Sequence, residues 1–598
     1  MLFWNCFFIL FIVAKAQFLK SNIVFIVADD LGWDDVSFHG SDQILTPNLD
    51  TMAYQGCPLQ QYYTDVEGTP SRSALFTGKY AMRLGTQGVS IKPSEDRGIP
   101  PTERLLPDYL KELGYATHLI GKWGVGKSRA HYLPSNRGFD TFYGFLGDAV
   151  DYFTYNAIDK SDKATFYGLD LFDDMDPVED ESRHLTNILT EKAVQVIREH
   201  NTSTPLYLHI SHAAPHIGGA LTDLQPPLDS LKDNEYIAHP LRRLYAGLVT
   251  SLDKSIGNII AALAEREILQ NTLVIFVSDN GAPTIGRSQN YGSNFPFRGT
   301  KSTPWEGGVR SVGVVWHASI PARRYNNLFH VTDWLPTLVS AAGGTVTNKI
   351  DGVNQWKNLI NDDATPPRQE VLISIDELRG WAALREGDFK IVVGDLSQTF
   401  NRYYGMDLKQ VKHARMTPFY EDVLIDSETG HVFKETLNLI LDVDLAEIKR
   451  SDLNLTQLYQ GVHRDICIPS KAKGCLYNIT ADPLETQDLW DDSPDIVRRL
   501  SLRLRSFWSD LKPRSPPLSD LRADPSARGF VWLPWLENNS SSVTSTPSRP
   551  SFPLKVTSGE VKYLINININ DLRTKVNSYI NRMGGAIIDS VESLFSLS

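Results

Sequence analysis

The sequence predicts an α/β fold, in which helices flank a doubly wound, mixed β-sheet and a smaller C-terminal α+β domain follows. Short apolar, β-branched runs at 23–28 and 273–278 have the pattern of strands buried on both faces of a sheet. Amphipathic helical stretches, of which 241–268 is the longest, alternate with these runs, as is typical of parallel sheets. After about residue 365 short strands separated by turns indicate an antiparallel meander.

The first domain is expected to span 17–365. Thr46-Pro47 has the pattern of an N-cap followed by a first-turn proline, and Gly56 follows the last residue of that helix. We expect further helices at 71–84, 105–113, 184–199 and 331–342, and further strands at 115–121, 205–211 and 309–316.

The second domain is expected to span 366–511. Its strands are predicted at 370–375, 380–385, 389–393 and 475–479, and its helix at 496–511. Residues 395–465 are polar and have the character of an insertion. Residues 512–598 form a Pro/Ser-rich segment and a tail, within which the apolar run 529–535 is expected to return to the body and 563–597 allows an amphipathic helix.

The N-terminus indicates entry into the secretory pathway. Residues 1–16 resemble a signal peptide, with Ala14-Lys15-Ala16 as the cleavage site; the alternative, an uncleaved anchor, is disfavoured because the apolar run is too short to span a bilayer. We therefore expect a secreted or lysosomal protein. Acceptor sequences for N-glycosylation support this expectation, at Asn201, Asn454, Asn478, Asn538 and Asn539.

The cysteines fit an oxidising compartment. Cys467 and Cys475 bracket a short Pro/Lys/Gly loop, which predicts a local disulfide. Cys57 then remains, either as a reactive thiol or, as we favour, as a small buried residue. The net charge of −12 argues against nucleic acid as the main partner, so any polyanion must be attracted by a local basic pocket. The oligomeric state is not indicated.

Polar pairs follow two of the predicted buried strands. Asp29 and Asp30 come directly after the first strand, and Asp279 and Asn280 come directly after 273–278. Ligands of doubly wound sheets bind beyond the carboxyl ends of the strands, which is where these side chains fall. An acidic pair at one strand end is usually a cap or an ion-pair partner, but two such pairs offer the oxygen donors that a hard cation prefers.

Several motifs follow one another along the chain between about 22 and 536. They are Val27–Gly40, the signature Gly68–Tyr80, and the segments at 137–144, 278–281, 298–301, 305–310, 476–483 and 524–532. Together they resemble the sulfatase family, and most of all arylsulfatase B (N-acetylgalactosamine-4-sulfatase). The family implies an alkaline-phosphatase-like fold with one divalent cation, usually Ca²⁺. It also implies a pocket for sulfate esters such as those of sulfated glycans.

The resemblance assigns roles to individual positions. Asp29, Asp30, Asp279 and Asn280 match the metal ligands, and Arg72 matches the arginine that steadies the nucleophile and those ligands. Lys122 and Lys301 match the lysines that hold sulfate oxygens, where cations suit the charge of the transferring group. His216 matches the histidine that protonates the leaving oxygen, although a lone histidine is more often structural.

Two positions depart from the family pattern. The cysteine that is oxidised to formylglycine is replaced by Gly68, which has no side-chain carbon to oxidise. Gly124 replaces the histidine that takes a proton from the formylglycine diol. The nucleophile and its proton acceptor are thus both absent.

These departures leave three hypotheses. The first is a secreted pseudosulfatase that keeps its Ca²⁺ and binds a sulfated ligand without hydrolysing it. The second is a hydrolase with residual or altered activity, in which Thr69 or a metal-bound water attacks. The third is a partner-binding protein whose pocket is a relic.

Overall fold

In the computed structural model the described residues are 20–160, 164–179, 181–218, 223–286, 288–361, 365–396, 400–405, 408, 418–459, 466–470 and 472–536, and the backbone of 554–555 and 564–565. The expected signal peptide, Asn538, Asn539 and all of the expected tail helix except 564–565 lie outside them. Among the helices of this described part, none is long and apolar enough to cross a membrane.

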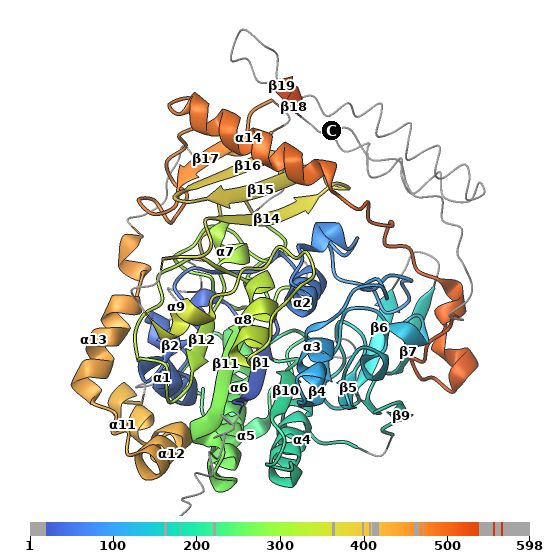
Figure 1. Cartoon of the computed structure of the whole chain (residues 1–598), viewed down its shortest axis with the longest axis vertical. Coiled ribbons are helices and arrows are strands. Elements are labelled where there is room, and N and C mark those ends of the chain that lie inside the picture. Colours follow the sequence, from blue (N-terminus) through green and yellow to red (C-terminus); the bar gives the residue numbers. More distant parts are fainter. Residues whose placement is uncertain are drawn as a thin grey trace, which may run out of the picture.

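A nine-stranded mixed sheet forms the centre of the first domain (Figure 1). The strand order is β2 (Cys57–Pro58), β12 (Gly313–Trp316), β11 (Thr272–Ser278), β1 (Asn22–Ala28), β10 (Leu206–Ser211), β4 (Ala116–Lys122), β5 (Thr141–Phe145), β8 (Phe172–Asp173) and β9 (Asp176–Pro177). The five strands from β11 to β5 in this order are parallel, and each strand beyond them pairs antiparallel with its neighbour.

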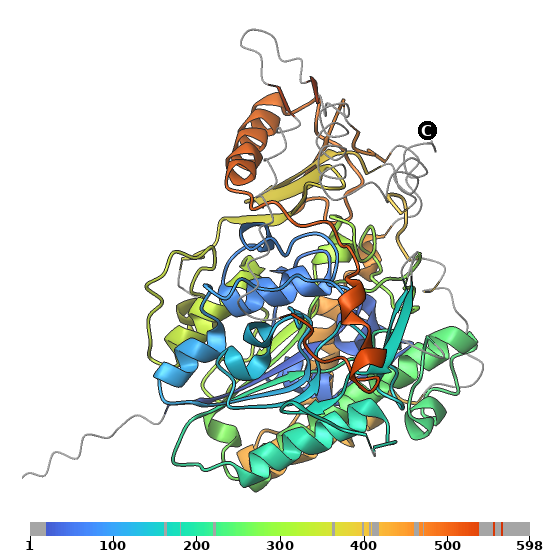
Figure 2. The same cartoon turned by 90° about the vertical axis from the view of Figure 1, so that its right-hand side faces the viewer.

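Helices cover both faces of this sheet, and Figure 2 shows the two helical layers on opposite sides. Side chains of β1 alternate between the layers: Val24 and Ile26 join one buried cluster, while Phe25 and Val27 join the other. The first cluster includes α1 (Pro47–Tyr54), α4 (Leu185–Glu199) and α6 (Pro240–Glu265). The second includes α2 (Gly68–Thr77), α3 (Leu106–Glu112) and α8 (Trp334–Ala341). The doubly wound prediction is therefore confirmed.

The second domain is an antiparallel four-stranded sheet covered by one helix, at the top of Figure 1. Leu384 and Ile391 face Leu500 and Leu504 of the helix in one buried cluster. The sheet order is β14 (Glu370–Asp376), β15 (Trp381–Glu386), β16 (Phe389–Gly394) and β17 (Cys475–Asn478), and the helix is α14 (Pro494–Ser509). The predicted meander and its helix are present.

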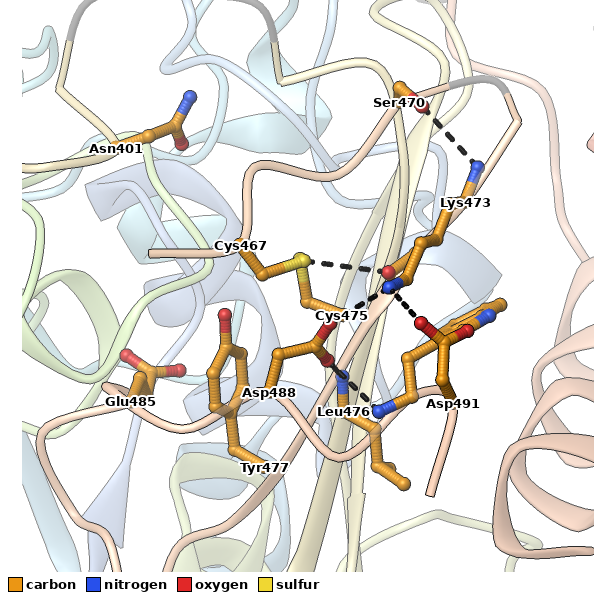
Figure 3. Close-up of a disulfide and its surroundings, with 12 residues drawn as sticks. Asn401, Cys467, Ser470, Lys473, Cys475, Leu476, Tyr477, Glu485, Asp488 and Asp491 are labelled. Carbon is orange, nitrogen blue, oxygen red and sulfur yellow. Dashed lines mark hydrogen bonds and ion pairs between the residues drawn. A yellow bond between two sulfur atoms is a disulfide. The ribbon is translucent and has the colours of Figure 1, made fainter. Parts of the chain in front are cut away.

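The predicted disulfide is also present (Figure 3). It joins Cys467 to Cys475 at the start of β17, with the two Cα atoms 6.0 Å apart. Beside it, Lys473 forms ion pairs with Asp488 and Asp491. Cys57 is buried and forms no disulfide, as favoured from the sequence.

Part of the polar insertion forms helices that lie on the first domain, not on the second. They are α11 (Tyr420–Ile425), α12 (Glu428–Leu437) and α13 (Val443–Leu453). Phe433 of α12 packs on Trp316 of β12 with ring centroids 4.8 Å apart. Residues 529–535 return to the first domain, where Trp532 Nε1 donates to the carbonyl of Ala157 at 3.1 Å.

Three shorter helices are α5 (Leu228–Lys232), α7 (Glu306–Val309) and α9 (Trp356–Ile360). The remaining strand pairs are β6 (Asn156–Lys160) with β7 (Thr165–Leu169), β3 (Tyr62–Tyr63) with β13 (Phe329–His330), and β18 (Leu554–Lys555) with β19 (Leu564–Ile565). The helix expected at 71–84 is in fact shorter, because Gly78 adopts a left-handed conformation (φ 65°) that ends α2 at Thr77.

The described glycosylation candidates differ in exposure. Asn201 is exposed in the loop after α4, and Asn478 is half-buried at the end of β17. The carboxamide of Asn454 lies directly against Gly40, whose Cβ, if present, would be 2.4 Å from Asn454 Nδ2. A glycan on Asn454 therefore needs this contact to open, whereas one on Asn201 does not.

Candidate functional site

Adjacent parallel strands bring the predicted polar residues to one edge of the sheet. β1 ends before Asp29 and Asp30, and its neighbour β11 ends before Asp279 and Asn280. On the other side of β1, β10 leads to the loop of His216, and β4 beyond it ends in Lys122. The site thus lies beyond the carboxyl ends of the strands, as expected for this sheet type.

Hydrogen bonds link three of the four expected metal ligands, and Asp29 precedes one of them in the chain. Asn280 Nδ2 donates to Asp30 Oδ1 at 2.6 Å, and the backbone N–H of Asp30 donates to Asp279 Oδ1 at 3.2 Å. Asp30 has a positive φ of 68°, an uncommon conformation for a residue other than glycine. The chain therefore turns sharply at the end of β1 to aim both Asp29 and Asp30 at the site.

Buried cations from three other elements surround these carboxylates. Arg72 of α2 lies 2.9 Å from Asp279 Oδ2, and Lys122 Nζ lies 2.7 Å from Asp29 Oδ2. Lys301 Nζ lies 2.6 Å from Asp30 Oδ1. Arg72, Lys122 and Lys301, assigned from the resemblance, thus all come to one site.

Asp148 is a site residue that the sequence analysis missed. Its Oδ1 lies 2.9 Å from Lys122 Nζ, so Lys122 bridges Asp148 and Asp29. Asp148 follows β5, the parallel neighbour of β4. The signal in the sequence is a polar residue that follows a strand. From the sequence, however, 137–144 is identified only as a segment that resembles the family, and no strand is predicted there.

Burial and charge act against each other in the pKa values of the site. Burial alone would raise the pKa of Asp148, but Lys122, His216 and Lys301 outweigh it and hold that pKa below its usual value. Burial would lower the pKa of Lys301, but Asp30 raises it well above the ordinary range. For Asp279, burial and the charge of Asp29 together raise the pKa. Burial would likewise lower the pKa of Lys122, but Asp148 and Asp29 raise it. Carboxylates therefore hold both lysines of the site charged.

The donor set fits a hard divalent cation. Asp29 Oδ1 and Asn280 Oδ1 are buried and have no hydrogen-bond partner among the described residues. Ligand atoms of Asp29, Asp30 and His216 lie within 4.8 Å of one another. Buried oxygen atoms without partners are costly unless a ligand satisfies them, and carboxylate and amide oxygens are what Ca²⁺ or Mg²⁺ prefers.

His216 faces the same group. Its Nδ1 lies 2.7 Å from the carbonyl of Ile217, and its Nε2 lies 3.6 Å from Asp30 Oδ2. If Nδ1 carries the proton for Ile217, Nε2 of the neutral ring offers its lone pair to the site. His216 thus lies beside Asp30, in the same group of residues as the expected metal ligands.

Gly68 lies at the centre of the site. It is the first residue of α2, and a Cβ added to it would be 3.0 Å from Asp279 Oδ2 and 3.7 Å from Lys122 Nζ. A reactive side chain at this position would therefore point between the carboxylates and the cations. Instead the position carries only hydrogen.

Gly124 lies beside Lys122 and Arg72, and its backbone conformation restricts which residues could replace it. A Cβ on it would be 3.2 Å from Lys122 Cε and 3.6 Å from Arg72 Cδ. Its φ is +70°, a region that residues with side chains rarely adopt. A histidine here would face Lys122, but only after the backbone adjusts.

Thr69 points away from the site. Its hydroxyl donates to the carbonyl of Gly124 at 2.8 Å and accepts from the backbone N–H of Ile91 at 3.1 Å. Both contacts tie neighbouring loops to the start of α2. The geometry gives no support to Thr69 as a nucleophile.

A second acidic group lies beside Gly68. Glu67 precedes α2, is buried, and accepts hydrogen bonds from the Ser302 and Ser90 hydroxyls. Burial raises the pKa of Glu67, while Lys301 opposes that shift. Neither Glu67 nor Ser90 was singled out from the sequence, because a single Glu or Ser in a loop carries no pattern of its own.

The sulfatase family model matches residues 21–344. Mouse arylsulfatase J is 33% identical over 530 residues, which cover 86% of this chain and 80% of that protein. The chain belongs to the sulfatase family. Mouse N-acetylgalactosamine-6-sulfatase is 31% identical over 338 residues, covering 54% of this chain and 62% of that sulfatase.

Solved structures share the fold. Ps i-CgsB in complex with k-i-k-neocarrahexaose has a TM-score of 0.63 at 23% identity, covering 84% of this chain and 95% of that one. A structure in complex with its substrate D-glucosamine-2-N,6-O-disulfate has a TM-score of 0.53 at 16% identity, covering 84% of this chain and 100% of that one. Gly68 and Gly124 of this sulfatase-family chain therefore lie within a fold that these solved structures share.

Proposed function

We propose that this protein binds the sulfate ester of a sulfated glycan in a Ca²⁺-dependent pocket and does not hydrolyse it by formylglycine chemistry. The observation that best supports this proposal is the environment of Gly68. The reactive side chain is missing there, while the buried cations Arg72, Lys122 and Lys301 remain around the position. Retained cations suit an anion, and the missing carbon excludes formylglycine.

Four residues would hold the cation: Asp29, Asp30, Asp279 and Asn280. When bound, Ca²⁺ would supply positive charge that polarises the ester oxygens. Three further residues would contact the ester directly. Lys122 and Lys301 would each donate to sulfate oxygens, and His216 would face the bridging ester oxygen.

The charges of the pocket make ligand binding depend on the metal. Carboxylates outnumber cations there, because Asp148 and Glu67 add to the three aspartates of the metal site. Without a cation this excess repels a sulfate ester, and with a divalent cation the pocket approaches neutrality. Binding of metal and of ester should therefore be positively coupled, and the coupling must be reciprocal.

The class of ligand is supported by what similar proteins bind. One solved structure with the same fold is in complex with its substrate D-glucosamine-2-N,6-O-disulfate, which is a sulfated sugar. For this chain we infer a sulfated glycan, met in the secretory pathway or outside the cell. The disulfide between Cys467 and Cys475 supports an oxidising compartment.

Calorimetry on the purified chain tests this proposal. A sulfated glycosaminoglycan oligosaccharide should bind in the presence of Ca²⁺, and its desulfated counterpart should not. Lys301→Ala should weaken binding at least tenfold, because one charged contact to sulfate is lost. Rapid multiple-turnover release of sulfate, near the rate of formylglycine sulfatases, would overturn the proposal. Absence of both Ca²⁺ and ester binding would favour a relic pocket.

A further inference from the structure

A hydroxyl group lies next to the place that Gly68 leaves empty. Ser90 Oγ is 3.7 Å from the position of a Cβ on Gly68, as close as Lys122 Nζ, and only Asp279 Oδ2 is nearer. Ser90 is half-buried, so a ligand in the pocket can reach it. Among these three neighbours, the hydroxyl is the one that can become a nucleophile without losing a metal ligand or a cation.

Ser90 has a base within reach. Its Oγ donates to Glu67 Oε2 at 3.5 Å, a long contact of the kind that shortens when a ligand closes a site. The other carboxylate oxygen of Glu67 accepts from Ser302 Oγ, which orients the carboxylate. A hydroxyl, a carboxylate and a third group that orients it are the parts of an activated nucleophile.

The start of α2 favours negative charge on Ser90. The backbone N–H of Thr69 points at Ser90 Oγ from 3.5 Å, at the N-terminal end of a ten-residue helix. The loop is anchored by its next residue, because Ile91 N–H donates to Thr69 Oγ1 at 3.1 Å. One contact of Ser90 and one of Ile91, both with the residue that follows Gly68, therefore hold Ser90 in place.

We propose that Ser90 replaces the missing nucleophile and accepts the sulfuryl group of a bound sulfate ester, with Glu67 as its base. This rests on the proposed function, that the pocket binds such esters. Ser90 Oγ forms a bond to sulfur and its proton passes to Glu67. The bond from sulfur to the ester oxygen breaks, and that oxygen leaves with the electron pair and takes a proton from water, or from His216 when Nε2 of its ring carries a proton. The ester and the serine thus become an alcohol and a serine O-sulfate.

The second departure, Gly124, agrees with this chemistry. A serine O-sulfate carries no further hydroxyl on the attached carbon, so it cannot expel sulfate by giving up such a proton. A proton acceptor at position 124 would then have no hydroxyl proton to accept. Release needs a water molecule to attack sulfur, and we expect it to be slow, so the sulfated serine accumulates.

The experiment uses the full chain with Ca²⁺ and an aryl sulfate that carries radioactive sulfur. After acid quenching, label should remain on the protein at up to one per chain and map to the peptide that contains Ser90. The phenol should appear in one burst of matching size. Glu67→Gln should slow labelling about a hundredfold, a typical loss for a general base.

Two further variants decide the outcome. Ser90→Ala should remove the label, while Ser94→Ala, a serine in the same loop that bonds to Asp159, should keep it. Unchanged labelling of Ser90→Ala, or label on another residue, overturns the inference. Absence of label while calorimetry shows the same ester bound overturns the inference and leaves the proposed function intact. Absence of ester binding overturns both. Melting temperature and Ca²⁺ binding confirm that each variant is folded.

Discussion

Asp279 Oδ2 lies 3.0 Å from the point at which a side chain on Gly68 would begin. The same oxygen lies 2.9 Å from Arg72 Nη2, so the empty position adjoins an expected metal ligand and its cation. The loss of a side chain here removes a reactive group and leaves its surroundings in place.

Gly68→Cys, coexpressed with the formylglycine-generating enzyme, should give at most weak turnover of aryl sulfates. The new side chain points into the site, but Gly124 supplies no proton acceptor. The double variant with Gly124→His should turn over faster. Equal rates for the single and double variants would contradict the role given to position 124.

Gly124 should also have a measurable conformational role. Gly124→Ala places a side chain at φ +70° and 3.2 Å from Lys122 Cε, so we expect it to cost more than about 1–2 kcal/mol of stability. Gly343→Ala is the matched control, because its φ is +78° and no heavy atom lies within 4 Å of the added carbon. Chemical denaturation measures both. Equal losses of stability in the two variants would show that the close approach of the added carbon to Lys122 has no effect on stability.

Ca²⁺ should stabilise the protein by binding the two buried oxygen atoms that have no hydrogen-bond partner among the described residues, Asp29 Oδ1 and Asn280 Oδ1. At a free concentration about a hundred times its Kd, the gain in stability is about 2.7 kcal/mol. Asp29→Asn should abolish most of this gain. Asp148→Asn should retain it, because Asp148 contacts Lys122 and is not among the expected ligands. Thermal melts with Ca²⁺ and with chelator test this. An equal loss of the Ca²⁺ response in both variants would be contrary to the assignment.

Asp65 should make stability depend on pH. Burial raises its pKa from 3.8 to about 7, although Val66 N–H and the Ser374 hydroxyl donate to it. The folded state therefore holds this proton more tightly than the unfolded state, and the stabilising contribution is lost as pH rises from about 4 to about 7. Relative to Asp65→Asn, the wild type should lose stability between about pH 4 and pH 7 and level off above that range. Parallel stability curves for both proteins would disprove this.

The disulfide should stabilise the second domain. Cys467 and Cys475 close a loop with a sequence separation of 8, for which loop entropy predicts about 2–3 kcal/mol. Cys467→Ser with Cys475→Ser should lower the free energy of unfolding by that amount in chemical denaturation. Cys57→Ser provides the control for a buried cysteine outside any disulfide. A double variant as stable as the wild type would exclude a stabilising role.

Much of the fold could be predicted because buried strands have a distinct pattern. The runs that become β1 and β11 are apolar throughout, and polar pairs follow them at once. The positions of Asp29, Asp30, Asp279 and Asn280 at one edge then follow from parallel pairing. The helix boundary at Gly78 was missed, since the chain beyond it remains compatible with a helix.

The remaining parts depend on contacts between distant segments. Asp148 joins the site only because β5 pairs with β4, and Ser90 only because its loop is tied to Thr69. Phe433 belongs to a polar insertion, and its packing on Trp316 of the first domain has no local signal. Such contacts are decided by tertiary packing, which local periodicity does not encode.

The most direct test of the account is one calorimetric titration of a sulfated oligosaccharide into the purified protein, with Ca²⁺ and then with chelator. The account predicts binding with Ca²⁺ that weakens at least tenfold when the cation is removed, since the carboxylates around Asp29 then repel the ester. Equal affinity in both titrations, or no binding in either, would contradict the claim that this pocket holds a sulfate ester through a bound cation.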